Sequence, residues 1–220
     1  MIAALLRLQL GGRWVLFLVA DAVLLVSGWF DALVSSRDSA SAGYVFVAIA
    51  PALLLGIPAL SDLVALERDA GSLDLLLSVP GATRHLQLRA FLVGAVMLLQ
   101  SWVAIATIWL GTDVAFALLP ALAHSAAVVA LVVCASLFWA ARLETAGAVG
   151  IATLVTAVGL GPWFLEAPTI PRTAAGGNSW LPGAETGLGL LANVVVLAAA
   201  STVLLLAARR RLARAELLLR

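Results

Sequence analysis

The chain has 220 residues, of which 63% are hydrophobic and 11% are charged, with a net charge of +1 and a mean hydropathy of +1.10. A soluble domain of this size carries about a quarter charged residues, so the composition excludes a water-soluble globule. The apolar segments are continuous and do not alternate with polar residues, which excludes the pattern of a transmembrane β-barrel. One helical crossing takes about 20 apolar residues. The sequence therefore predicts an all-α, polytopic membrane protein.

The hydropathy pattern predicts a single transmembrane domain over 1–220 with six membrane-spanning helices. Residues 1–12 mix apolar residues with Arg7 and Gln9, which is typical of an amphipathic helix at the membrane surface, or of an extension of the first span. No small-residue cleavage site follows the first apolar run, so we expect the N-terminus to belong to the mature protein. The predicted spans are 14–34, 44–66, 86–110, 114–141, 145–165 and 187–208.

Two of the predicted spans have unusual compositions. Two of the segments that connect spans are longer and more polar than the others. Pro51 and Pro58 are expected to bend the second span. The fifth span is rich in glycine and alanine, which allow close helix packing or leave room for a cavity. The polar segments are 67–83, after the second span, and 166–185, after the fifth.

The arginines fix the predicted orientation. Every basic residue is arginine, and six spans with a cytoplasmic N-terminus put all arginines except Arg37 and Arg172 on the cytoplasmic side. This asymmetry satisfies the positive-inside rule. We therefore expect both termini to be cytoplasmic and the protein to reside in the cytoplasmic (inner) membrane.

Polar residues inside the predicted spans are few and scattered. Asp21 is either an intramembrane functional acid or an interfacial carboxylate neutralised by a nearby arginine. His124 is either a hydrogen-bonded residue of the bundle or a metal or proton site. Asn193 lies apart from both, and Cys134 is the single cysteine, so one chain forms no disulfide. Paired catalytic groups of an intramembrane enzyme are not present in the pattern.

The segment 67–83 is predicted to contain a short helix at the cytoplasmic face. Gly71 can end the second span and Ser72 can cap a new helix, with Asp74 in its first turn. Pro80 and Gly81 stop this helix, and Thr83 is expected to cap the third span. One apolar face is formed by Leu73, Leu76 and Leu77. By its physical chemistry alone, this face suits a lipid surface and a protein groove equally.

The same segment resembles the permease subunits of type-2 ABC exporters. In succession it contains Glu67-Arg68, Gly71-Ser72-Leu73 and Leu76-Leu77-x-x-Pro80, as does the segment after the second span in that family. The run Arg209-Arg-Arg-Leu-Ala-Arg-Ala-Glu216 after the last span, the amphipathic N-terminus and the span count are also similar. A lysine is common in the family near the start of the third span, where this chain has Arg89 or no equivalent.

The resemblance implies a transport subunit, not an enzyme. The chain has no lysine and no Gly-x-x-x-x-Gly-Lys-Ser/Thr loop, so ATP and magnesium would bind a separate ATPase and this chain would hold no cofactor. Two ATPase subunits and a second permease copy, identical or different, would complete the transporter in the lipid bilayer. No nucleic acid would take part. The resemblance says little about the substrate, but a path lined by small and apolar side chains would suit an amphipathic, lipid-like or drug-like one.

The resemblance also implies roles for individual residues. The second and fifth spans would line the path, and 166–185 with Trp163, Trp180 and Pro182 would gate its outer end. Arg142 and Glu144 would make a lesser cytoplasmic contact. The ATPase-docking residues would be Glu67, Arg68, Asp69, Gly71, Ser72, Leu73, Asp74, Leu76, Leu77, Pro80 and Arg84. The alternatives are a haem-exporter-like permease of cytochrome c maturation and a non-ABC carrier or scaffold.

Overall fold

The computed structural model describes residues 19, 22–23, 26–27, 51–69, 82–111, 118–160 and 187–218. Within these ranges the chain is helical except for turn residues at 141–145 and 160, and no strand occurs in them. The all-α prediction is thus confirmed for this part of the chain. The predicted interfacial helix 1–12, all but five residues of the first span, and the outer loop 166–185 lie outside the described residues.

The second predicted span is represented by two consecutive helical segments that differ in winding. The π-helix η2 covers Pro51–Gly56, and the α-helix α4 covers Ile57–Asp69. A proline removes a backbone donor and interrupts the regular hydrogen-bond ladder, and Pro51 and Pro58 lie at the start of the two segments. The Ser61 hydroxyl donates a hydrogen bond of 3.0 Å to the Pro58 carbonyl. The winding therefore changes within the predicted second span, between Gly56 and Ile57.

Among the described residues, three helices are long and apolar enough to cross a membrane: α6 (Ala82–Gly111), α7 (Leu118–Ala140) and α10 (Gly187–Leu218). Helix α8 (Ala146–Gly159) and the stretch Ala52–Leu63 are apolar but shorter. These lengths support a membrane-embedded protein. The expected cap at Thr83 is wrong, because α6 already begins at Ala82 and Thr83 lies in its first turn.

Helix α10 covers the predicted sixth span and continues well beyond its predicted end at residue 208. The arginines after Ala208 end the apolar stretch, but this part of the chain has no glycine or proline to end the helix. Leu212 is also buried against the rest of the bundle. The membrane-spanning stretch and its basic continuation therefore form one helix.

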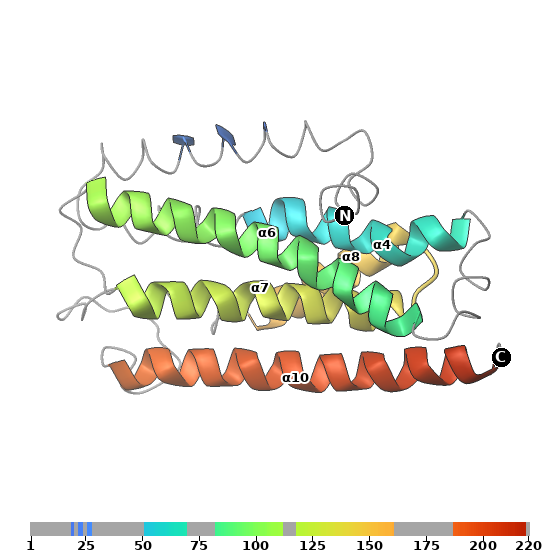
Figure 1. The fold of residues 1–220 in the computed structure, drawn as a ribbon. Helices are drawn as coiled ribbons and strands as arrows, with labels where there is room; N and C mark the ends of the chain where they lie inside the picture. Colours follow the sequence, from blue (N-terminus) through green and yellow to red (C-terminus); the bar gives the residue numbers. More distant parts are fainter. Residues whose placement is uncertain are drawn as a thin grey trace.

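Helix α7 is the centre of the bundle. It packs against α6, α10, α8 and α4, and Figure 1 shows it between α6 and α10. In the most apolar 18-residue stretch of α7, 72% of the residues are buried, against 22% in the corresponding stretch of α10. One group of buried residues joins α4 and α6 to α7 through side chains such as Leu63, Leu86 and Val132. A second joins α6, α7 and α10, with Ile105, Leu131 and Leu197 among its members.

Among the glycines for which the structure describes the surroundings, the tightest position is one that the sequence pattern did not single out. A Cβ placed on Gly94 of α6 would lie 2.6 Å from Cγ2 of Val133 in α7. In the small-residue-rich α8, a Cβ on Gly147 or Gly159 would meet nothing within 4 Å, and one on Gly150 would make an ordinary 3.6 Å contact with Ile57. Glycine is thus needed for close packing at the α6–α7 contact.

Candidate functional site

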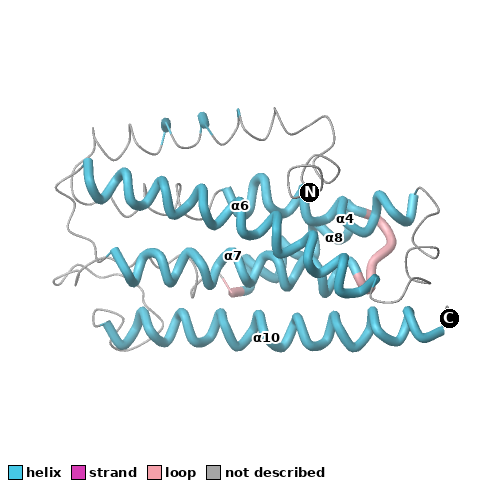
Figure 2. The backbone as a smooth tube through the Cα atoms, viewed as in Figure 1, coloured by secondary structure: helices cyan, strands magenta, loops and turns pink. Residues whose placement is uncertain are grey.

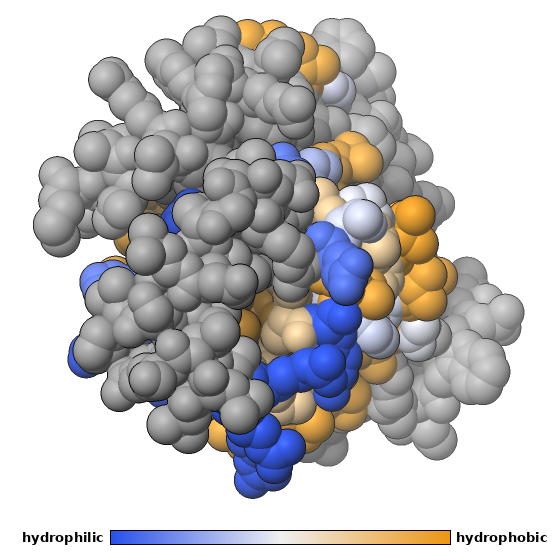
Figure 3. Space-filling model, turned by 90° about the vertical axis from the view of Figure 1, so that its right-hand side faces the viewer, coloured by the Kyte–Doolittle hydropathy of each residue, from blue (hydrophilic) through white to orange (hydrophobic). Residues whose placement is uncertain are grey.

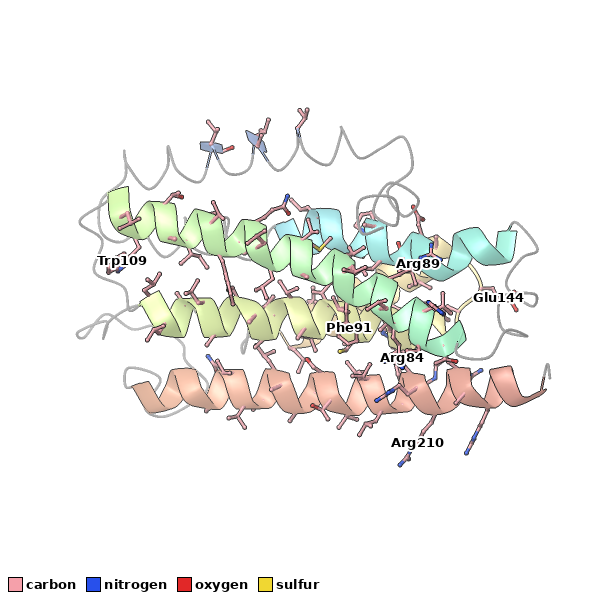
Figure 4. The ribbon with its side chains drawn as sticks, in the orientation of Figure 1. Arg84, Arg89, Phe91, Trp109, Glu144 and Arg210 are labelled. Carbon is pink, nitrogen blue, oxygen red and sulfur yellow. The ribbon has the colours of Figure 1, made fainter. Side chains whose placement is uncertain are left out.

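Four parts of the chain meet at one end of the bundle, at the right of Figures 1 and 2. They are the end of α4 at Asp69, the start of α6 at Ala82, the turn 141–145, and the basic end of α10. The predicted coupling segment is thereby flanked by two helix ends on the same side of the molecule. The predicted secondary contact, Arg142 and Glu144, lies in the turn at that end (Figure 4).

The structure describes only part of the predicted docking set. Glu67, Arg68 and Asp69 belong to the last turn of α4, and Arg84 is exposed in the first turns of α6. The other predicted docking residues lie outside the described residues: Gly71, Ser72, Leu73, Asp74, Leu76, Leu77 and Pro80. The predicted gate residues Trp163, Trp180 and Pro182 also lie outside them.

Apart from Asp62 in the interior of α4, the charged residues of the described helices gather toward this end. Residues 90–111, 118–140, 146–160 and 187–208 contain no Asp, Glu, Lys or Arg. Figure 3 looks onto the charged end and shows hydrophilic side chains running across the described surface between apolar patches. Glu144 is the exposed acid among the residues whose side chains are described here. Arg68 lies in the last turn of α4, and the other arginines of this end among the described residues are Arg84, Arg89, Arg142, Arg209, Arg210, Arg211 and Arg214.

The turn between α7 and α8 presents its charges from an ordered frame. The amides of Arg142 and Leu143 both donate to the Trp139 carbonyl at 2.8 Å. The Arg142 guanidinium carbon lies 3.6 Å from the centre of the Phe138 ring, a cation–π contact. Phe138 in turn meets Trp139 edge to face, with ring centres 4.9 Å apart. Arg142 and Glu144 are both exposed, so they are accessible to a partner.

Side-chain hydrogen bonds fasten α8 to α7 close to this turn. The indole N–H of Trp139 donates to the Thr156 hydroxyl at 2.9 Å, and that hydroxyl donates to the Ala152 carbonyl at 2.8 Å. The Thr145 hydroxyl caps α8 by accepting from the Ala148 amide at 3.3 Å. The Trp139–Thr156 bond joins residues far apart in the chain, and no local sequence signal indicates it.

We expect the Trp139–Thr156 bond to be measurable as a coupling between the two helices. The double variant Trp139→Phe/Thr156→Val should lose less free energy of unfolding than the two single variants lose together. The difference is the coupling energy, and we expect about 0.6 kcal/mol, the typical value for such bonds in membranes. Unfolding would be followed by circular dichroism during titration with denaturing detergent. Thr202→Val is the matched control, because the exposed Thr202 bonds only its own helix at Ala198. Additive effects of the two changes would contradict the prediction.

The buried polar residues in the half of the bundle away from the charges fit a structural role. His124 is fully buried within α7, which agrees with its interpretation as a residue of the bundle. Ser101 of α6 and Asn193 of α10 are also buried. Among the described residues, no three His, Cys, Asp or Glu side chains come together as a metal site would require. Asp21 lies outside the described residues.

Comparison of the chain with protein-family models, with curated proteins and with solved structures finds no match in any of the three. The charged end of the bundle, with the turn 141–145 and the two helix ends that flank residues 70–81, is therefore the feature from which a function is inferred.

Proposed function

We propose that the chain is the permease subunit of an ATP-driven exporter of the type-2 ABC class. It crosses the cytoplasmic membrane six times with both termini inside, pairs with a second permease copy, and binds an ATPase that is a separate chain. The observation that carries the proposal is the meeting of α4, α6 and the turn 141–145 at one charged end of an apolar bundle. A coupling helix needs this arrangement, because it must be tied to two membrane helices at the face where the ATPase docks.

The packing of the bundle would allow a movement of such a segment to be transmitted to the membrane helices. Residues 70–81 connect α4 to α6. Helix α4 packs on α8, and α6 packs on α7. When two ATPase subunits bind ATP and close, they would push on this segment and displace both attached helices. Helices α4 and α8, from the second and fifth spans, would then move together and open the path to the outside.

The exposed side of α8 bears on the substrate class. Large apolar side chains cover it, and Ile151, Val155 and Val158 are each about two-thirds exposed. In the proposed transporter this surface would face the path or the lipid. An apolar wall suits an amphipathic or lipid-like substrate, because it offers few polar partners to a hydrophilic one.

Co-purification tests the proposal. Tagged full-length chain would be extracted from the membranes of its native cells, with untagged chain and an unrelated tagged membrane protein as controls. We expect an ATPase with a Gly-x-x-x-x-Gly-Lys-Ser/Thr loop in equimolar amount, together with ATP hydrolysis in the purified sample. Absence of such a subunit would contradict the proposal and would favour a carrier or scaffold. Haem absorbance in a sample that does contain the ATPase would favour the haem-exporter-like alternative.

A further inference from the structure

Exposed arginines surround the outer face of α10 near its C-terminal end. At about 100° per residue, Arg210 and Arg214 lie on the face opposite the buried residues, and Arg209 and Arg211 lie at its two edges. The buried residues of the helix recur on one side, with Leu197, Ala208 and Leu212 all at or below 6% exposed. The arginines beside them are exposed instead: Arg209, Arg210, Arg211 and Arg214. Figure 4 shows the labelled Arg210 directed away from the other helices.

This arginine face continues the apolar outer face of the same helix. Val195 and Val203, eight residues apart, are 57% and 66% exposed, and Leu206 between them and the arginines is 49% exposed. Arg210 follows Val203 by seven residues and Arg214 follows it by eleven, which is close to two and three helical turns. If the apolar part of this face contacts lipid acyl chains, its basic part therefore lies at the level of the lipid headgroups.

The length of the basic stretch matches the depth of a headgroup layer. Residues 209–214 rise about 8 Å along the helix, and each headgroup region of a bilayer is about 5–8 Å deep. Arginine pairs with phosphate through two parallel N–H donors, and its aliphatic stem can lie along the acyl chains. Clusters of basic residues next to a transmembrane helix attract anionic lipids by this combination of charge and position.

We propose that the outer face of α10 binds the headgroups of anionic phospholipids through Arg209, Arg210, Arg211 and Arg214. The occupant is lipid and not the ATPase, because Arg210 and Arg214 lie on the side of the bundle in line with its lipid-facing residues, and Arg209 and Arg211 flank them. An ATPase would approach the end of the bundle, where α4, α6 and the turn 141–145 meet. The proposal depends on the protein being embedded in a membrane and not on its being an exporter.

A fluorescent reporter on the outer face of α10 tests the proposal in the full chain. The buried single cysteine is first removed by Cys134→Ala, and Leu206→Cys then carries a bimane label one turn before the arginines. The labelled chain is reconstituted in vesicles in which brominated phosphatidylglycerol or brominated phosphatidylcholine replaces the unbrominated lipid stepwise. We expect phosphatidylglycerol to occupy the site at least about twofold more strongly than phosphatidylcholine, because each arginine near the surface favours an anionic lipid.

Three matched variants identify the groups responsible. Changing all four arginines to glutamine should bring the two lipids to equal quenching, whereas changing all four to lysine should retain most of the preference. Arg84 and Arg142 lie elsewhere at the same end of the bundle, and changing both to glutamine should leave the preference unchanged. The preference should also persist when inorganic phosphate replaces chloride at equal ionic strength, because the site recognises a headgroup held in the bilayer.

Equal quenching by the two lipids in the arginine-containing chain would overturn the proposal, whatever the variants do. A glutamine variant that folds normally by circular dichroism and retains the preference would also overturn it. If the lipid preference is absent and the glutamine variant loses a co-purifying ATPase, the arginines belong to a protein interface. The vesicle experiment contains no ATPase, so its outcome is separate from the outcome for the proposed function.

Discussion

Replacing Gly94 with leucine is expected to destabilise the protein by about 3 kcal/mol, the upper end of the usual penalty for overpacking. Even the first added atom would lie 2.6 Å from Cγ2 of Val133. Val133 is β-branched and 2% exposed, so it has little freedom to move aside. Because α7 is the centre of the bundle, a shift of α6 away from it should disturb the whole packing. The measurement is the midpoint of unfolding in a denaturing-detergent titration.

Two further variants separate a steric effect from a general effect of leucine. Gly147→Leu adds the same side chain to α8 at a position with open space, and it should unfold close to the unmodified chain. Gly94→Ala should be destabilising alone and should be rescued in part by Val133→Ala, which removes the atom in the way. An equal midpoint for Gly94→Leu and Gly147→Leu would show that the close approach is not required.

Changing Leu76 and Leu77 together to aspartate is expected to separate ATP hydrolysis from transport, without unfolding the membrane helices. In the proposed function these leucines form the apolar face seated in the ATPase groove. Losing two such contacts, each about 1.5 kcal/mol, weakens binding by roughly a hundredfold. The measurements are recovery of the ATPase with the tagged chain, and ATP-dependent transport in vesicles.

The control for this change is the replacement of both leucines by methionine, which keeps an apolar face of similar volume. We expect this variant to retain the ATPase. Helix content measured by circular dichroism should be equal for both variants. Unchanged recovery of the ATPase with the aspartate variant would show that Leu76 and Leu77 are not the docking face, even if the exporter proposal itself holds.

The helices could be predicted from the sequence more fully than their ends. Hydropathy reports where the apolar environment stops, and a helix stops only where its backbone hydrogen bonding stops. The two points separate after Ala208, because arginine is a good helix former but a poor residue for the membrane interior. They also separate at Ala82, four residues before the predicted start of the third span.

The contacts between helices could not be predicted from one sequence. A high content of glycine and alanine drew attention to α8, but among the described glycines of α6 and α8 the one that meets another helix most closely is Gly94 in α6. What makes a glycine necessary is the residue opposite it, and a sequence pattern does not show which residue that is. The same holds for Arg142, whose exposure was predicted but whose stacking on Phe138 depends on how the turn folds.

The uninterrupted length of α10 has a mechanical consequence. Its 32 residues extend about 48 Å, somewhat more than the full thickness of a bilayer. It contains no proline, and its glycines, Gly187 and Gly189, are both in its first turn. A rod without a hinge tilts as a unit, so a rotation of about 5° near one end displaces the other by about 4 Å. The helix can therefore act as a lever arm that reports a change on one face of the membrane to the other.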